Sequence, residues 1–307
     1  MIYFNSDYLE GAHPAIMARL METNMVQTVG YGEDEYCETA REKIKLACQA
    51  PEADVHFLVG GTQTNTTVIA AILRPWQGVL SAVSGHINCH EAGAIESTGH
   101  KVITLPTNNG KITAQQVRDY VEWHKNDEST EHIVQPGMVY ISHPTEGGTL
   151  YSKAELTALY DTCKQYGLPL FIDGARLGYG LVADGNDITL PELARLCDVF
   201  YIGGTKVGAL FGEAVVIMNE ALKKDFRFIM KQRGGRLAKG RLLGIQFDVL
   251  FTEDLYTRIS RHAIDMAYQI REIFVSAGYP LLFDSPTNQQ YPIMPDDELA
   301  EIGKNFG

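Results

Sequence analysis

The amino-acid sequence predicts an α/β protein whose core is a mainly parallel, seven-stranded sheet flanked by helices. Short apolar runs alternate with helical patterns between residues 55 and 218. Strands of this kind are typical of a parallel sheet that is covered on both faces. The expected strands are residues 55–59, 79–83, 102–105, 138–142, 170–172, 199–202 and 215–218.

Helical patterns lie between most of these strands. Ser152 precedes Glu155 by three positions, which is the spacing of a capping box and predicts that a helix begins there. Three carboxylates at residues 33–35 predict the start of another helix that runs to Cys48, because negative charge is favourable at a helix N-terminus. The other expected helices are residues 62–73, 113–124 and 190–197, with 152–166 as the capped one.

The pattern changes at a basic, glycine-rich stretch that begins near residue 233. Two helical segments follow it, the longer at 253–277, and a further helix is expected at 296–304. We therefore expect a large domain over residues 1–232 and a smaller C-terminal α/β domain over residues 233–307. A small α/β domain normally continues with another strand, so we expect this domain to extend beyond Gly307.

The composition restricts the class of partner and the compartment. The net charge is −12, and an acidic surface repels nucleic acid and anionic membranes, so we expect a small-molecule partner instead. The 5 cysteines form no CxxC pair and are odd in number, which is typical of reduced thiols in a cytoplasmic protein. The N-terminal residues lack the basic and apolar regions of a signal peptide, and no apolar stretch approaches the ~18 residues of a spanning helix.

Three features occur in the order that pyridoxal-5′-phosphate (PLP) chemistry requires. The first is a glycine turn between an expected strand and an expected helix, with the sequence GGTQTN at residues 60–65. Such a turn directs backbone N–H groups and the positive helix end at an anion, which suits a phosphate. The alternative is a simple connecting turn, since the motif is neither a P-loop nor a GxGxxG fingerprint.

The second feature is Asp173, at the end of an expected buried strand, where α/β proteins place ligand-binding groups. Its carboxylate could pair with a protonated pyridine nitrogen, although Asp is also a common helix N-cap. The planar guanidinium group of Arg176 could donate hydrogen bonds to a carboxylate or to a phenolic oxygen.

The third feature is Lys206, which follows an apolar strand among small residues. Burial lowers the pKa of a lysine and makes it a competent Schiff-base nucleophile, whereas the alternative is a solvated loop lysine. A phosphate turn, then Asp173, then Lys206 together predict a PLP enzyme with the cofactor on Lys206.

Histidine, cysteine and glutamate crowd together at residues 86–91, which raises the alternative of a zinc site. His86 and His90 are four positions apart, as on one helix face, so they could form half of a zinc site. No HExxH motif and no second cluster downstream complete it, and a PLP site needs no metal. We therefore expect no metal.

The chain resembles the threonine aldolase group of the β-eliminating lyases, which are PLP enzymes of fold type I. The resemblance extends from Asn5 to at least Arg236. The matching motifs are Ser6-Asp7, Tyr31-Gly32-Glu33-Asp34, Gly61-Thr62-Gln63-Thr64-Asn65, His86-x4-Glu91-Ala92-Gly93-Ala94, Asp173-Gly174-Ala175-Arg176-Leu177 and Thr205-Lys206.

The resemblance implies a role for each candidate site residue. Asp173 would pair with the pyridine nitrogen, Lys206 would carry the cofactor, and His86 would lie flat on the ring. Ser6, on an N-terminal arm, and Arg176 would hold the substrate carboxylate. The residues implied to contact the phosphate are Gly61, Thr62, Gln63 and Thr205. The segment Tyr31–Asp34 would lie near the cofactor of a neighbouring subunit, in a homodimer or homotetramer.

The chain departs from that family in two places. An Asn-Thr-His run is replaced by SHPTEGG at residues 142–148, so Thr145 is expected where the family has a histidine that meets the substrate hydroxyl. A late carboxylate-binding arginine is not evident near the C-terminus. The resemblance still implies cleavage of a β-hydroxy-α-amino acid of the threonine type to glycine and an aldehyde, with His86 or a water that it orients as the base.

Two other functions stay open at this point. β-Elimination, racemisation or transamination of another amino acid would use the same cofactor, because the fold does not choose among these reactions. A catalytically silent PLP-fold protein that serves as a binding partner is the other alternative, against which the intact Lys206, Asp173 and Arg176 argue.

Overall fold

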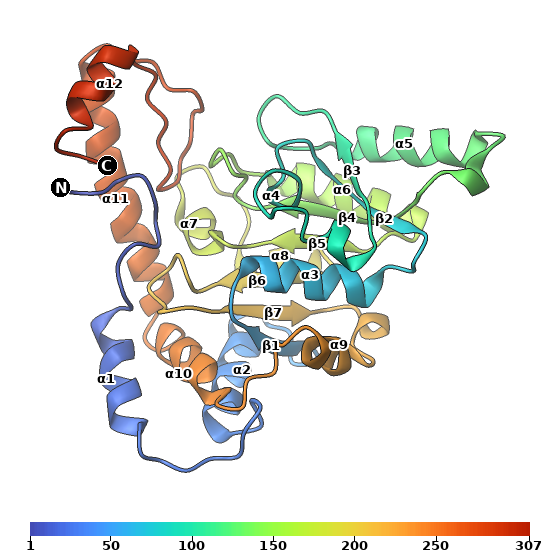
Figure 1. The fold of residues 1–307 in the computed structure, drawn as a ribbon, viewed down its shortest axis with the longest axis horizontal. Helices are drawn as coiled ribbons and strands as arrows, with labels where there is room; N and C mark the ends of the chain where they lie inside the picture. Colours follow the sequence, from blue (N-terminus) through green and yellow to red (C-terminus); the bar gives the residue numbers. More distant parts are fainter.

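In the computed structural model, which describes residues 1–307, seven strands form a single sheet (Figure 1). The strands are β1 (Asp54–Leu58), β2 (Gln77–Ala82), β3 (Val102–Leu105), β4 (Gln135–Ser142), β5 (Leu170–Asp173), β6 (Val199–Gly203) and β7 (Glu213–Ile217). Their order across the sheet is β1-β7-β6-β5-β4-β2-β3. Strand β7 is antiparallel to both of its neighbours, and every other adjacent pair is parallel. The predicted mainly parallel, seven-stranded sheet is confirmed.

The helices that were predicted begin and end close to the expected positions. The helices of the structure are α1 (Pro14–Thr23), α2 (Glu35–Ala47), α3 (Gly61–Ile72), α4 (His86–Cys89), α5 (Ala114–Asn126), α6 (Lys153–Tyr166), α7 (Leu177–Val182), α8 (Leu190–Arg195), α9 (Phe226–Gln232), α10 (Arg241–Leu250), α11 (Leu255–Ser276) and α12 (Asp296–Ile302). The prediction did not include α1, α4, α7 and α9, which are additional. Ser152 and Glu155 form the predicted capping box at α6, and Asp34 caps α2. No helix combines the length and the apolar character that crossing a bilayer would require.

Both faces of the sheet are buried, which explains why most of the strand residues are apolar. Successive side chains of a strand point to opposite faces, and the buried residues accordingly divide into two hydrophobic clusters. In β4, Val139 and Ile141 belong to the larger cluster, whereas Met138 and Tyr140 belong to the smaller one. The smaller cluster also contains apolar residues of α3 and α9, so these helices cover that face.

The C-terminal part of the chain packs closely on the rest. Helix α10 contacts α1 and α2, and its Gly244 has no room for a side chain, because a Cβ there would lie 2.5 Å from Sγ of Cys37. Helix α11 packs against α7, and the two chain ends lie side by side through a bridge between Ile2 and Phe306 (Figure 1). Beyond α11 the chain forms α12 and an isolated bridge between Leu281 and Pro292, in addition to the bridge from Phe306 to Ile2. The division at residue 233 stays a prediction.

Candidate active site

The predicted site residues gather at the carboxyl ends of the parallel strands, where open α/β sheets bind their ligands. Asp173 is the last residue of β5, and Lys206 follows the end of β6 by three positions. Two glycines allow these strand ends to lie close together. A Cβ on Gly174 would lie 2.0 Å from the carbonyl oxygen of Tyr201, and one on Gly203 would lie 2.2 Å from that of Ala175.

Four donors surround the buried carboxylate of Asp173. Tyr140 donates to Oδ2 at 2.6 Å and Asn65 Nδ2 donates to the same oxygen at 3.1 Å, while Tyr201 and the Ala175 N–H donate to Oδ1. Burial, followed by the Asp173 charge, raises the pKa of both tyrosines well above the ordinary value, so their hydroxyls remain protonated donors. The carboxylate is therefore fixed between the sheet and α3. It is not the N-cap of α7, which is Arg176.

His86 is oriented by a neighbouring carboxylate that is itself tied to Asp173. Its Nδ1 lies 2.8 Å from Oε1 of the buried Glu91, and this hydrogen bond is the main reason why the pKa of His86 is raised. Asn65 Nδ2 donates to the same Glu91 oxygen at 2.7 Å, so one amide group links Glu91 to Asp173. The structure contains no group of three or more His, Cys, Asp or Glu side chains placed to hold a metal ion.

The amine of Lys206 makes neither a hydrogen bond nor an ion pair. Its Nζ lies 5.8 Å from the ring centroid of Tyr8, and the backbone is held by Tyr179, whose hydroxyl donates to the Lys206 carbonyl oxygen. An unpaired lysine amine on a fixed backbone, beside a buried carboxylate and a histidine, is available for covalent catalysis.

A buried glutamate organises the residues just before Lys206. Glu213 accepts hydrogen bonds from the Thr205 hydroxyl at 2.8 Å and from the Gly204 N–H at 3.1 Å. Thr205 in turn accepts from the Gly212 N–H at 3.0 Å. Burial raises the pKa of Glu213 to about 8, which favours its protonated form at neutral pH. A protonated Glu213 can donate to Thr205, which would release the Thr205 hydrogen for another acceptor.

The glycine turn at the start of α3 presents donors without partners. Gly60 provides no side-chain cap, and the N–H groups of Gly61, Thr62 and Gln63 make no hydrogen bond in the protein. The Gln63 side chain instead stabilises the turn, because it accepts from the Val59 N–H at 3.0 Å and donates to the Arg233 carbonyl at 3.1 Å. These unpaired donors at a helix N-terminus suit an anion.

Arg176 forms a bidentate ion pair with Asp7. Its Nε lies 2.6 Å from Oδ2 and its Nη2 lies 3.0 Å from Oδ1, while Asn288 donates to Oδ2 at 3.0 Å. The ion pair brings the N-terminal segment to the site, and Ser6, the residue before Asp7, makes no side-chain hydrogen bond. The Nη1 atom of Arg176 has no partner, so this part of the guanidinium group can still donate hydrogen bonds to a ligand.

The loop after β4 differs from the sequence expectation. Thr145 was expected to face the substrate, but its hydroxyl lies 2.7 Å from that of Thr149 and accepts the Thr149 N–H. Glu146 lies against His86 instead, because its Oε1 accepts the His86 backbone N–H at 2.9 Å and the Ser142 hydroxyl at 2.5 Å. His143 is buried, which lowers its pKa to about 4 and keeps it neutral.

Sequence reasoning assigned no role to several residues that complete the site. A usable signal existed for the two tyrosines, because Tyr140 and Tyr201 each lie two positions before the end of an apolar strand and therefore share a face with the strand end. Glu213 begins an otherwise apolar strand, which is an unusual place for a charge. Asn65 and Asp7 offered no such signal, since their partners are distant in sequence.

The chain is similar to characterised proteins over most of its length. The family model described as beta-eliminating lyase matches residues 4–287. A low specificity L-threonine aldolase of Pseudomonas aeruginosa is 30% identical over 288 residues, which cover 93% of this chain and 82% of the relative.

Solved structures share the fold. The threonine aldolase of Leishmania major is 44% identical, with a TM-score of 0.97 and coverage of 100% of this chain and 89% of that one. Cystalysin from Treponema denticola, whose structure contains PLP, is 15% identical, with a TM-score of 0.73 over 99% of this chain and 80% of that one, and shares the fold alone. The predicted fold type I architecture is confirmed. Because the family model matches almost all of the sequence and the Leishmania structure superimposes over its whole length, the chain belongs to the beta-eliminating lyase family.

Proposed function

We propose that the protein is a PLP-dependent lyase that cleaves the Cα–Cβ bond of a β-hydroxy-α-amino acid of the L-threonine type and releases glycine and an aldehyde. The observation that carries this proposal is the meeting of the unpaired Lys206 amine, the fixed Asp173 carboxylate and His86 at one edge of the sheet. Family membership and the similarity to threonine aldolases support the reaction.

The residues present fit PLP. The three unpaired N–H groups at the start of α3 and the Thr205 hydroxyl would hold its phosphate, and Asp173 would hold its pyridine nitrogen protonated. Lys206 would hold it covalently through Nζ, with His86 over the ring. When bound, PLP accepts the electron pair of the Cα–Cβ bond that breaks.

Substrate binding is assigned to Arg176 and Ser6. The Nη1 atom of Arg176 and the Ser6 hydroxyl have no partner in the protein, and both lie beside the Asp7 ion pair. A substrate carboxylate would be bound there by charge-assisted hydrogen bonds. The hydrogen bond between Nδ1 of His86 and Glu91 raises the pKa of the ring and leaves only Nε2 for another partner.

Incubation with PLP and L-threonine tests the reaction. We expect equal amounts of acetaldehyde and glycine, measured by coupling acetaldehyde to alcohol dehydrogenase and by amino-acid analysis, with no release of ammonia. Ammonia and a keto acid from threonine or another amino acid would identify β-elimination or transamination instead. PLP binding without any turnover would support a silent binding protein.

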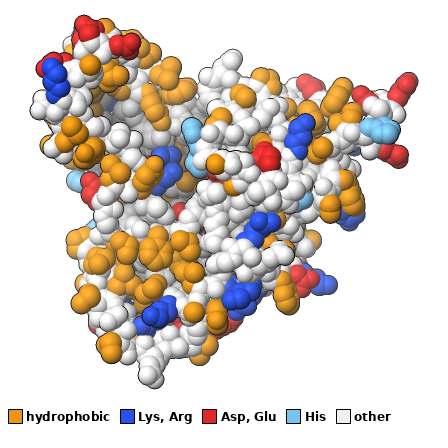
Figure 2. Space-filling model, in the orientation of Figure 1, with side chains coloured by type: hydrophobic (Ala, Val, Ile, Leu, Met, Phe, Trp, Pro, Cys, Tyr) orange, Lys and Arg blue, Asp and Glu red, His pale blue; other side chains and the backbone are white.

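We also propose that the protein assembles as a homodimer or homotetramer with a site shared between subunits. Apolar side chains are exposed along α1 and the segment after it, and Figure 2 shows a hydrophobic area where Figure 1 places α1 and α10. The exposed residues are Met17, Met21, Met25, Val26, Val29 and Tyr31. Extended apolar areas of this kind commonly mark protein interfaces, and two-fold association is the commonest closed arrangement.

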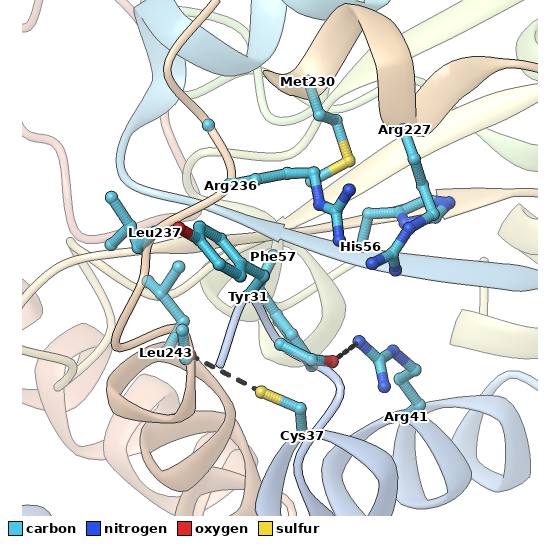
Figure 3. Close-up of a pocket in the computed structure, with 13 residues that line it drawn as sticks. Tyr31, Cys37, Arg41, His56, Phe57, Arg227, Met230, Arg236, Leu237 and Leu243 are labelled. Carbon is cyan, nitrogen blue, oxygen red and sulfur yellow. Dashed lines mark hydrogen bonds between the residues drawn. The ribbon is translucent and has the colours of Figure 1, made fainter. Parts of the chain in front are cut away.

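A cationic pocket adjoins this area and supports a shared site. Arg41, Arg227 and Arg236 line it together with Tyr31 (Figure 3), and Glu33 is the carboxylate that pairs with Arg227 and Arg236. The buried Nε of Arg236 has no partner, so the pocket could receive an anionic group from a neighbouring subunit. The five unpaired cysteines are typical of a reducing compartment, and we propose a cytoplasmic location.

Sedimentation velocity at micromolar concentration tests the assembly. We expect a dimer or tetramer, and Tyr31→Ala together with Met25→Asp should weaken association, because one removes an exposed ring and the other places a charge in the apolar area. Cys89→Ser, at an exposed cysteine elsewhere, is the control. A fully active monomer would refute the shared site and leave the assignment of Lys206 intact.

A further inference from the structure

The loop between β4 and α6 contains Glu146, a carboxylate to which the sequence analysis gave no role. We infer that Glu146 is the catalytic base that takes the proton from the β-hydroxyl group of the substrate. The inference rests on the proposed function and names the group that performs its proton transfer.

The two oxygens of the Glu146 carboxylate have different surroundings. Oε1 accepts both the His86 backbone N–H and the Ser142 hydroxyl, so this oxygen is committed to holding the side chain in place. Oε2 makes no hydrogen bond in the protein. It is not one of the fully buried polar atoms that lack a partner. One oxygen therefore anchors the carboxylate and the other is free to accept a proton.

Residues of the C-terminal segment hold the backbone of Glu146 and of the two glycines that follow it. Tyr291 donates its hydroxyl to the Glu146 carbonyl oxygen at 2.9 Å. A Cβ on Gly147 would lie 3.0 Å from the ring of Phe283, and one on Gly148 would lie 2.1 Å from Oγ of Ser285. The loop is thus packed tightly enough to hold a base in one geometry, as proton transfer requires.

The charged groups around Glu146 are those of the site. Arg176 and Asp173 both act on it electrostatically, so the charge of the carboxylate is coupled to the proposed substrate-binding arginine and to the cofactor-binding aspartate. The other titratable side chains that face it are Tyr140, Tyr151 and Tyr291, each raised in pKa by burial and therefore neutral. His86 contacts it through the backbone N–H and not through the ring.

The cleavage step conserves protons and electrons without any further reactant. The β-hydroxyl O–H bond breaks and its proton moves to Oε2 of Glu146, while the oxygen forms the aldehyde C=O bond as Cα–Cβ breaks. The electron pair of that bond would pass to the electron acceptor that PLP supplies when bound. The α-carbon then regains a proton, which balances the one taken by Glu146, so that the products are neutral acetaldehyde and glycine.

The protonation equilibrium of Glu146 sets the expected pH dependence. Burial raises its pKa, the Ser142 hydrogen bond opposes this change, and the Asp173 charge reinforces it. A base is active when deprotonated, so kcat should rise with pH through this raised pKa. A raised pKa also makes the carboxylate a stronger base than an exposed glutamate.

The test compares three variants of the loop in the holoenzyme. Glu146→Gln keeps an oxygen for the His86 N–H but cannot take a proton, and we expect kcat for L-threonine to fall by ~10²–10⁴-fold. Glu146→Asp should retain part of the activity and the acidic limb of the pH profile. Thr145→Ser, at the neighbouring residue that the resemblance favoured, keeps the hydroxyl that pairs with Thr149 and should retain a rate close to that of the wild type.

Two further measurements separate loss of the base from loss of the site. The PLP dissociation constant and the exchange of the glycine α-hydrogen with D₂O, followed by NMR, should be nearly unchanged in Glu146→Gln, because neither involves the β-hydroxyl. Wild-type protein that cleaves no threonine would refute the proposed function. If the wild type cleaves threonine, two results would overturn the assignment of Glu146. One is a Glu146→Gln variant that cleaves threonine as fast as the wild type, and the other is a variant whose glycine exchange falls as much as its threonine cleavage.

Discussion

Lys206→Ala will abolish turnover and the absorbance band that PLP gains when it is bonded to the Lys206 amine. The reason is that Lys206 supplies the unpaired amine at the carboxyl edge of the sheet, and its charge acts on Asp7, His86 and Glu213. Without this amine the cofactor can be held only by its phosphate and ring contacts, and covalent catalysis is lost. Absorbance spectra and threonine cleavage assays, with the wild type as reference, measure both effects.

Chemical trapping identifies the attachment site independently of activity. Borohydride reduction of the wild type, followed by peptide mapping, should place PLP on the single peptide that contains Lys206. Lys224→Ala removes an exposed lysine that makes no hydrogen bond and should leave the labelling unchanged. Label on another lysine would contradict the central assignment.

Asp173→Asn will fold but lose activity by on the order of 10²-fold or more, as expected when a specific electrostatic stabiliser is removed. A neutral amide cannot keep the pyridine nitrogen protonated. The structure adds a second reason, because all four partners of Asp173 are donors and the new NH₂ group would face at least one of them. The loss should appear in kcat, with circular dichroism confirming the fold.

Tyr140→Phe is the matched control for Asp173→Asn. It removes one donor from the carboxylate but keeps the charge, so it should cost much less activity. If Asp173→Asn turned over at nearly the wild-type rate, Asp173 would have only a structural role.

The sheet and the position of the site could be predicted from sequence because both depend on local pattern. Strands buried on two faces are mostly apolar, and this pattern located all seven. Asp173 and Lys206 follow two of these strands directly, so parallel pairing was sufficient to bring them to one edge.

The remaining contacts depend on tertiary packing that no local pattern contains. The ion pair of Arg176 joins residues 169 positions apart, and its partner Asp7 contacts Asn288 across 281 positions. In the loop after β4, the family resemblance favoured Thr145, but hydrogen bonds from Ser142 and His86 direct Glu146 into the site. Side-chain direction in such a loop is set by its neighbours, which the sequence does not specify.

The place of β1 at the edge of the sheet has a consequence for how the protein is made. It is the first strand to leave the ribosome, yet its sole partner in the sheet is β7. About 150 residues separate the two strands, so at ~5–20 residues per second the nascent chain carries β1 unpaired for roughly 10–30 s. An unpaired apolar strand is a template for aggregation. Slow translation between residues 58 and 213 would therefore lengthen the period in which the emerging chain depends on chaperones.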